Sequence, residues 1–258
     1  MITIETLEKL ARQCQTGLFP NTVREYFQHA FLAELYQLPE AEKLLFKGGT
    51  ALRILYGSPR FSEDLDFSLF GVSPRQTKSF VEGEFVRVLA EMERIGIEVE
   101  MGAKSNTTSG GYFGAATFKV PDFQPVEVAI NISTRKGKTL RGEVDSVAND
   151  FVPTYTVVHL PQKELVEEKV FGALRERKKP RDFYDLYFIM RKGMLSPDQK
   201  KKIAAIKDEI IADAEKIDFR GELGAFLPAN QQAIIRDFVR ALKAEINVSD
   251  PPTPSFNL

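Results

Sequence analysis

Two aspartates in a strand-like segment are the residues of this sequence best suited to chemistry. Asp64 and Asp66 lie in residues 61–69, FSEDLDFSL, where apolar and polar residues alternate. The alternation predicts a β-strand, so both carboxylates are expected on one face, with Cα atoms about 6–7 Å apart. Such carboxylates repel unless a cation lies between them, and their oxygens suit Mg²⁺ bound alongside phosphates. An edge strand with solvated acids is the alternative, although Asp is uncommon in strands.

A glycine-rich turn precedes this strand at Lys47-Gly48-Gly49-Thr50. Glycine lets the backbone approach a ligand closely, and the N–H groups at a helix start attract phosphate. An ordinary turn in which Thr50 caps the following helix is an equally good explanation of the turn in isolation. The spacing matches neither a Walker motif nor a dinucleotide-binding fingerprint.

An α/β arrangement must position these two features. The hydrophobic patterns predict a helix directly after the glycine turn, four further strands besides 61–69, and helices on either side. The predicted strands are 44–47, 97–101, 112–120 and 125–133, and the predicted helices of this part are 3–14, 22–38 and 75–95.

The pattern changes near residue 159, after which only helices are predicted. These helices are 161–178, 182–192, 197–217 and 229–247. The expected organisation is therefore an α/β domain over residues 1–158, a helical domain over 159–248 and a flexible tail over 249–258, which is rich in proline.

The composition narrows the chemistry. With 35 basic and 36 acidic residues among 258, the net charge of −1 argues against a broad basic coat for nucleic acid. One cysteine, Cys14, excludes a disulfide within the chain and a cysteine-based zinc site. The two histidines leave little for histidine chemistry. No apolar run is long enough to span a membrane and no signal-peptide pattern begins the chain, so a soluble cytoplasmic protein is expected.

Two segments together resemble the AbiEii/AbiGii toxin family of nucleotidyltransferases, within the polymerase-beta-like superfamily. They are FKGGTALRILYGSPRFSEDLDFSL, residues 46–69, and VEEKVFGALRERKKPRDFYDL, residues 166–186. The resemblance covers roughly residues 20–190. It implies a nucleotidyltransferase core with a mixed sheet and a helical C-terminal part, an NTP substrate and one or two Mg²⁺ ions.

The resemblance assigns roles to the first segment. Asp64 and Asp66 would hold Mg²⁺, and the turn would cradle the triphosphate. The nucleotide-binding residues expected from this segment are Gly48, Gly49, Thr50, Arg53 and Ser62.

Relatives of this kind add a third carboxylate from a neighbouring strand, and two residues compete for that position. Glu127 is the only acid on the polar face of the strand over 125–133. The Ser-Thr-Arg that follows, however, resembles a family stretch whose register places Asn131 there. The two residues are about 13 Å apart along a strand, so both cannot serve one metal pair. We predict Glu127 as the third metal ligand; Asn131 at that position would weaken a second metal or abolish activity.

The second segment contributes a lysine and two aspartates. Lys169 lies on an apolar helix stripe, where a lysine either extends out to solvent or reaches a specific anion. The resemblance implies contact with the nucleotide phosphates. Asp182 could cap its helix, whereas Asp185 flanks an apolar stripe and needs a partner. The resemblance places both acids near the active site, where one orders Lys169 or accepts a proton from the attacking hydroxyl; the sequence leaves open which one.

Two short basic segments lie beside the motifs, at 134–141 and 175–181. Local clusters of this kind can contact phosphates, although solvated loops explain them equally well. The candidate RNA-binding residues are Arg135, Lys136, Arg177, Lys178 and Arg181.

The resulting hypothesis is a Mg²⁺-dependent toxin that transfers a nucleotide from an NTP to RNA. The resemblance implies a tRNA 3′ end as acceptor and a cognate antitoxin as a further partner. Two alternatives stay open: an aminoglycoside-type nucleotidyltransferase that acts on small molecules, and a catalytically inactive protein that binds RNA or a partner.

Overall fold

The computed structural model describes residues 3–13, 19–102, 106–108, 110–119, 123–135 and 140–249. These residues form two compact units. The first is the chain up to Pro161 together with Phe226–Ala229, and the second is Gln162–Ala225 together with the chain from Asn230 onward. Cys14, Lys136 and most of the predicted tail lie outside the described residues.

The first unit is built on a mixed sheet of eight strands among the described residues, in the order β3-β5-β6-β2-β1-β8-β7, with β4 paired to β5. At its centre β2 pairs with β1 in antiparallel and with β6 in parallel orientation. The strands are β1 (Leu44–Lys47), β2 (Leu65–Leu69), β3 (Glu98–Met101), β4 (Asn106–Thr108), β5 (Gly111–Lys119), β6 (Val126–Thr134), β7 (Glu143–Val147) and β8 (Tyr155–His159).

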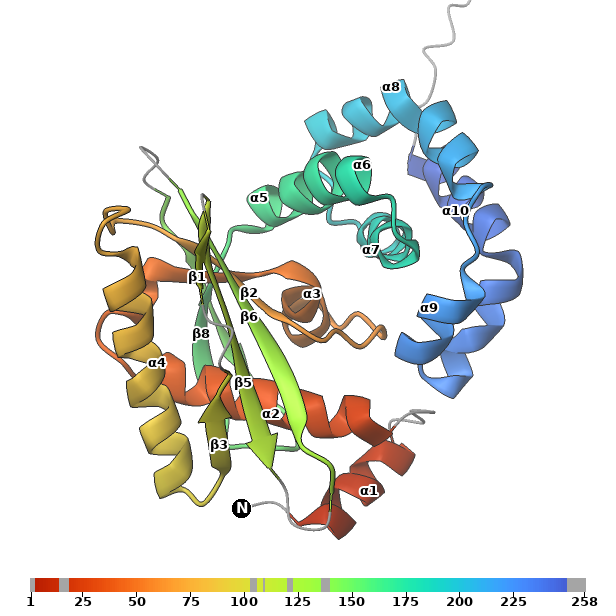
Figure 1. The fold of residues 1–258 in the computed structure, drawn as a ribbon. Helices are drawn as coiled ribbons and strands as arrows, with labels where there is room; N and C mark the ends of the chain where they lie inside the picture. Colours follow the sequence, from red (N-terminus) through yellow and green to blue (C-terminus); the bar gives the residue numbers. More distant parts are fainter. Residues whose placement is uncertain are drawn as a thin grey trace, which may run out of the picture. The chain divides into compact units, whose positions relative to one another are not determined.

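Two helices, α2 (Phe19–Leu35) and α4 (Thr77–Arg94), pack on one face of this sheet (Figure 1). Phe27 of α2 stacks on Phe118 of β5 at 4.5 Å between ring centroids. Phe85 of α4 meets Tyr112 of the same strand at 6.2 Å. Helix α1 (Ile4–Gln13) packs on α2, and α3 (Gly48–Tyr56) follows β1 directly. The apolar core of the first unit therefore lies on the side of the sheet that faces α2 and α4.

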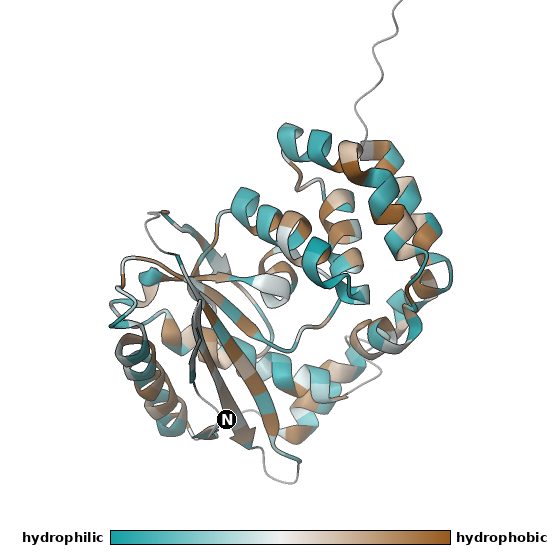
Figure 2. Ribbon diagram, turned by 45° about the horizontal axis from the view of Figure 1, so that its top comes forward, coloured by the Kyte–Doolittle hydropathy of each residue, from teal (hydrophilic) through white to brown (hydrophobic). Residues whose placement is uncertain are grey.

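The opposite side of the central strands is polar. Alternation along β6 buries Ile130 and Ile132 on the helix-covered face and leaves Asn131 and Ser133 half-buried on the other. Figure 2 shows the long strands mainly in brown, whereas the helices carry alternating brown and teal turns, as helices with one buried side do.

The second unit is helical. An aromatic cluster holds it together, in which Phe238 lies 4.6 Å from Phe219 and 6.0 Å from Tyr184. Its elements are α5 (Gln162–Val166), the π-helical turn η2 (Glu167–Ala173), α6 (Leu174–Arg177), α7 (Pro180–Arg191), α8 (Pro197–Ala214), α9 (Arg220–Phe226), the 3₁₀ segment η3 (Ala229–Asp237) and α10 (Phe238–Ser249).

The predicted α/β class is confirmed, but the strand that carries the aspartates is shorter than predicted. It begins at Leu65, so Asp64 precedes it. Residues 61–64 do not join the sheet because their backbone groups bond elsewhere. Gln28 donates to the carbonyls of Ser62 and Glu63, and Phe61 N–H donates to Phe226 O at 2.8 Å.

The sequence did not predict the strands β4, β7 and β8, the helix α9 or the short 3₁₀ turn η1 (Ala41–Lys43). Strand β7 is exposed at every residue except Val147, so it has no apolar face to produce an alternating signal. Helix α9 contains two glycines within seven residues, which lowers its helix propensity. Across the part of the chain described above, no helix is both long and apolar enough to cross a membrane.

Candidate active site

The glycine turn lies directly against Asp66. Gly48 begins α3 with a φ of 87°, a conformation that favours glycine. A Cβ at this position would lie 2.1 Å from Asp66 Oδ2. Only a residue without a side chain therefore lets the start of α3 approach the carboxylate so closely. The register of the sheet contributes to this approach, because Lys47, directly before Gly48, is paired with Asp66 across β1 and β2.

Two further polar side chains lie close to the second glycine, Gly49. A Cβ at Gly49 would lie 2.6 Å from Arg60 Nη2 and 2.8 Å from Ser62 Oγ. Arg60 is buried and also donates to Phe61 O at 2.8 Å. The predicted site residues Gly49 and Ser62 are thus neighbours, although they are 13 positions apart in sequence.

Side chains from two helices hold the segment that ends at Asp64. The buried hydroxyl of Thr50 donates to Asp64 O. Gln28 of α2, only 1% exposed, donates from Nε2 to Ser62 O at 3.0 Å and Glu63 O at 3.1 Å. Gln28 was not predicted as a site residue from the sequence. The only signal was a polar residue inside an amphipathic helix, and that pattern does not identify its partner.

Asn131, not Glu127, lies beside Asp66. The parallel register of β2 and β6 pairs Asp66 with Asn131, and Asn131 Nδ2 donates to Asp66 Oδ1 at 3.1 Å. Glu127 is four residues earlier in β6, exposed, and paired with Thr117 of β5. The register therefore does not support our choice of Glu127 as a ligand shared with Asp66, because the two positions on β6 are about 13 Å apart.

Arg53 occupies a structural position. Its guanidinium makes a two-pronged ion pair with buried Glu25 of α2 and donates to Ser58 O at 3.2 Å and Pro59 O at 2.9 Å. It also lies 3.7 Å from the centroid of the Phe61 ring. These contacts fix the loop after α3, and they give no support to the predicted phosphate contact of Arg53.

A buried histidine lies on the same helix as Glu25. His29 Nδ1 and the Tyr155 hydroxyl form a hydrogen bond of 2.9 Å. Burial, together with the charge of Arg53, lowers the pKa of His29 to about 4. His29 is therefore neutral at pH 7 and belongs to the core.

In the second unit, Asp185 is the partner of Lys169. Lys169 Nζ donates to Asp185 Oδ2 at 2.8 Å, and the two side chains are 13% and 1% exposed. Lys169 lies in η2, and π-helical turns are frequent at functional sites. The structure thus resolves which aspartate orders Lys169.

Asp182 has a different task. It accepts from Arg177 Nη2 at 2.6 Å and from the backbone N–H of Lys179 at 3.3 Å, so it caps the start of α7. The basic run around it is paired with acids of the same unit: Lys178 with Asp213 at 2.6 Å, and Arg181 with Glu222 at 3.0 Å. These ion pairs account for Arg177, Lys178 and Arg181 within the unit itself. Binding of RNA by this basic run stays a prediction.

The polar face of the sheet carries two further basic residues. Arg135 Nε donates to Ser68 Oγ at 3.2 Å, and Lys47 Nζ donates to Ser133 Oγ at 3.3 Å. Both serines lie in the strands that carry Asp66 and Asn131. Arg135 thus lies next to the strands that carry Asp66 and Asn131, and its contact with RNA stays a prediction.

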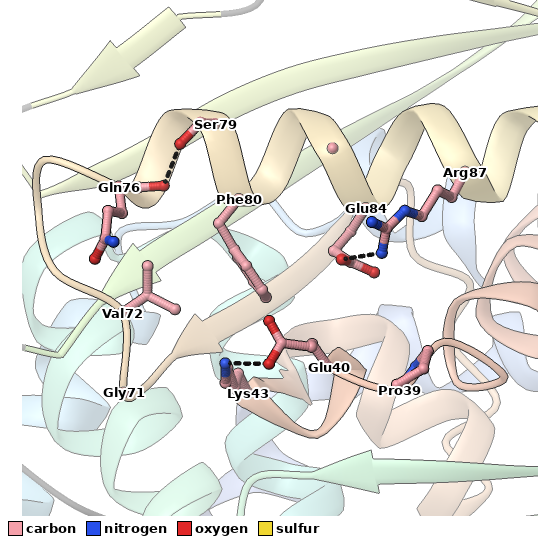
Figure 3. Close-up of a pocket in the computed structure, with 11 residues that line it drawn as sticks. Pro39, Glu40, Lys43, Gly71, Val72, Gln76, Ser79, Phe80, Glu84 and Arg87 are labelled. Atoms are coloured by element: carbon pink, nitrogen blue, oxygen red, sulfur yellow. Dashed lines mark hydrogen bonds and ion pairs between the residues drawn. The ribbon is translucent and has the colours of Figure 1, made fainter.

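A pocket of about 750 Å³ in the first unit lies apart from these residues (Figure 3). Helix α4, the segment around Glu40 and the turn at Gly71 line it. Its charged side chains pair with one another, Lys43 with Glu40 at 2.7 Å and Arg87 with Glu84 at 3.0 Å. None of the predicted site residues is among the lining residues.

Comparison with known proteins adds to this geometry. The family described as "Nucleotidyl transferase AbiEii toxin, Type IV TA system" matches residues 30–257. The fold is similar to the crystal structure of a candidate nucleotidyltransferase from H. pylori, with a TM-score of 0.61 and 20% identity over 88% of this chain and 92% of that chain. It is also similar to the crystal structure of JHP933 from Helicobacter pylori, again with a TM-score of 0.61 and 20% identity, over 89% and 91% of the two chains. No curated protein sequence matches the chain.

Proposed function

The chain belongs to the AbiEii family of nucleotidyl transferase toxins of type IV toxin–antitoxin systems, and we propose that it transfers a nucleotide from an NTP to RNA. The match includes both sequence motifs, because it spans residues 30–257. We further propose the 3′ end of a tRNA as the acceptor and an antitoxin as the protein that counteracts it. Both follow from the resemblance to the family.

The observation that carries this proposal is the approach of the α3 N-terminus to Asp66. The 2.1 Å between Asp66 Oδ2 and a Cβ placed on Gly48 leaves room for nothing but glycine. A helix start with free N–H groups attracts phosphate oxygens, and a carboxylate attracts the cation that accompanies them. The two features therefore suit one ligand, a metal-bound triphosphate.

The donor set fits Mg²⁺. Asp64 and Asp66 offer hard oxygens, and Mg²⁺ is commonly held by one or two carboxylates together with substrate phosphates. Among the residues that the structure describes, no cluster of three acidic, histidine or cysteine side chains could hold a metal by itself. When bound, Mg²⁺ would neutralise charge on the phosphates that react.

In the proposed reaction, a hydroxyl oxygen of the acceptor attacks the α-phosphorus of the NTP. The bond to the bridging oxygen breaks, pyrophosphate leaves, and the hydroxyl proton passes to solvent or to a carboxylate. Gly48 and Gly49 would present backbone N–H groups to the triphosphate, with Ser62 beside them. Thr50 acts through Asp64, whose carbonyl it holds. Such catalysis depends on positioning and electrostatics.

Lys169 is proposed as a nucleotide contact and Asp185 as the residue that orients it. A lysine held at 2.8 Å by a carboxylate that is 1% exposed has a fixed direction. The contacts of Asp182 do not favour its predicted catalytic role, because its carboxylate caps α7 and pairs with Arg177.

The test is a label-transfer assay with the purified full chain, Mg²⁺, each α-labelled NTP in turn, and total RNA or purified tRNA. We expect label on RNA of tRNA size, and loss of at least about 100-fold for Asp64→Ala and Asp66→Ala. Glu93→Ala, at an exposed position of α4, is the matched control and should retain full activity.

Three outcomes would contradict the proposal. Label on an aminoglycoside in place of RNA would favour a small-molecule nucleotidyltransferase. RNA binding that survives Asp64→Ala, without any transfer by the unaltered chain, would indicate an inactive binding protein. Equal transfer by Asp66→Ala and the unaltered chain would place the chemistry elsewhere.

A further inference from the structure

Asn131 occupies the position next to Asp66 at which a third carboxylate would complete a metal site. Lys47, Asp66 and Asn131 form one row across three neighbouring strands, β1, β2 and β6. In this row the amide of Asn131 donates to Asp66 Oδ1 at 3.1 Å. An acid at position 131 would instead bring a second negative charge to hydrogen-bonding distance of Asp66.

No other acid of β6 can replace it. Glu127 shares the polar face of the strand but lies four residues away, beside Thr117. Its side chain is exposed, whereas Asp66 and Asn131 are half-buried. A cation held by Asp66 is therefore out of reach of Glu127, at about 13 Å along the strand.

We infer that Asn131 takes the third position and that the first unit binds a divalent cation weakly unless an NTP supplies the missing ligands. The inference rests on the proposed function. The amide nitrogen of Asn131 donates to Asp66 and holds this carboxylate in place without a metal. The neutral amide contributes no negative charge that would attract a cation. Affinity for a hard cation rises with the charge of its ligands, so the phosphates of the NTP must supply what position 131 lacks.

The consequence is that cation and nucleotide bind interdependently. Without nucleotide, the proposed ligands are the carboxylates of Asp64 and Asp66, and the row of Asp66 adds only the neutral amide of Asn131 and the positively charged Lys47. With nucleotide, phosphate oxygens complete the ligand set, so each ligand strengthens the binding of the other by the same factor.

The experiment measures Mn²⁺ binding to the full chain by calorimetry, with and without an NTP analogue that has a non-hydrolysable α,β-bond. We expect weak Mn²⁺ binding alone and at least about ten-fold tighter binding with the analogue. Asn131→Asp should tighten nucleotide-free Mn²⁺ binding about ten-fold or more. It should also lower the melting temperature without metal and raise it with Mn²⁺, because two adjacent carboxylates repel until a cation joins them.

The Glu127→Gln variant tests the inference even if Asn131→Asp fails to fold, because position 127 is exposed and the substitution should not disturb folding. Unchanged Mn²⁺ binding supports the inference, and weaker binding would overturn it. Tight nucleotide-free binding by the unaltered chain, or no gain in Asn131→Asp, would also overturn it. Transfer of label by the same preparation shows that such a failure concerns Asn131 and not the proposed function.

Discussion

Replacing Gly48 with alanine should separate the geometry of the site from the stability of the fold. Gly57, at the other end of α3, is the matched control, because both glycines have positive φ, 87° and 77°. An alanine at either position should cost about 1–2 kcal/mol for its backbone conformation, reduced by roughly 0.4–1 kcal/mol because alanine restricts the unfolded chain. A Cβ at Gly57 meets no atom within 4 Å, so Gly57→Ala should lose no stability beyond this backbone cost.

At Gly48 the new Cβ would lie 2.1 Å from Asp66 Oδ2, where ordinary contact begins at 3.4 Å. The carboxylate or the helix start must therefore move by about 1.3 Å, the difference between these distances. A displacement of about 1 Å in a reacting arrangement can cost roughly 100-fold in rate. We expect Gly48→Ala to lose at least about 100-fold in label transfer, and Gly57→Ala to keep activity close to that of the unaltered chain.

Urea unfolding of both variants, beside the transfer assay, completes this test. Two folded variants with very different activities would support the proposed contact between α3 and Asp66. Activity retained by a folded Gly48→Ala would refute the reasoning, and so would equal losses of activity in the two variants.

Three further predictions concern side chains that support the site. The lowered pKa of His29, about 4 against 6.5 in the unfolded chain, means that its contribution to stability is complete above pH 6.5 and is lost as the pH falls to 4. This loss is about 3 kcal/mol, and urea titrations at several pH values should show a smaller decline for His29→Gln; an identical decline would contradict the assignment. Gln28→Ala removes both donors to residues 62 and 63, so we expect a loss of about 1–3 kcal/mol in unfolding free energy and a fall in kcat; full activity would show that Gln28 does not position Asp64. Asp185→Ala should cost about 3–5 kcal/mol because it leaves Lys169 without its buried partner, whereas Asp213→Ala, at a more exposed pair, should cost clearly less; equal losses in urea would contradict the burial argument.

Local sequence patterns predicted much of the fold. The predicted strands at 44–47, 97–101, 112–120 and 125–133 match β1, β3, β5 and β6 within one residue at each end. These predictions succeeded because periodic burial follows from the geometry of a single strand or helix. The same reasoning extended the strand of the aspartates too far, since Gln28 and Phe226 take over the backbone bonds of residues 61–64.

The chemistry of the site divides in the same way. The sequence alone predicted the glycine turn, the two aspartates and Lys169 as site residues and indicated the family, because each of these depends on residue types at short spacing. Only the tertiary structure decided that Asn131 and not Glu127 lies at Asp66, and that Asp185 rather than Asp182 holds Lys169. Strand register and side-chain pairing join residues 65 and 16 positions apart, and the free energy of these contacts arises when distant segments pack together. No periodicity within one segment encodes them.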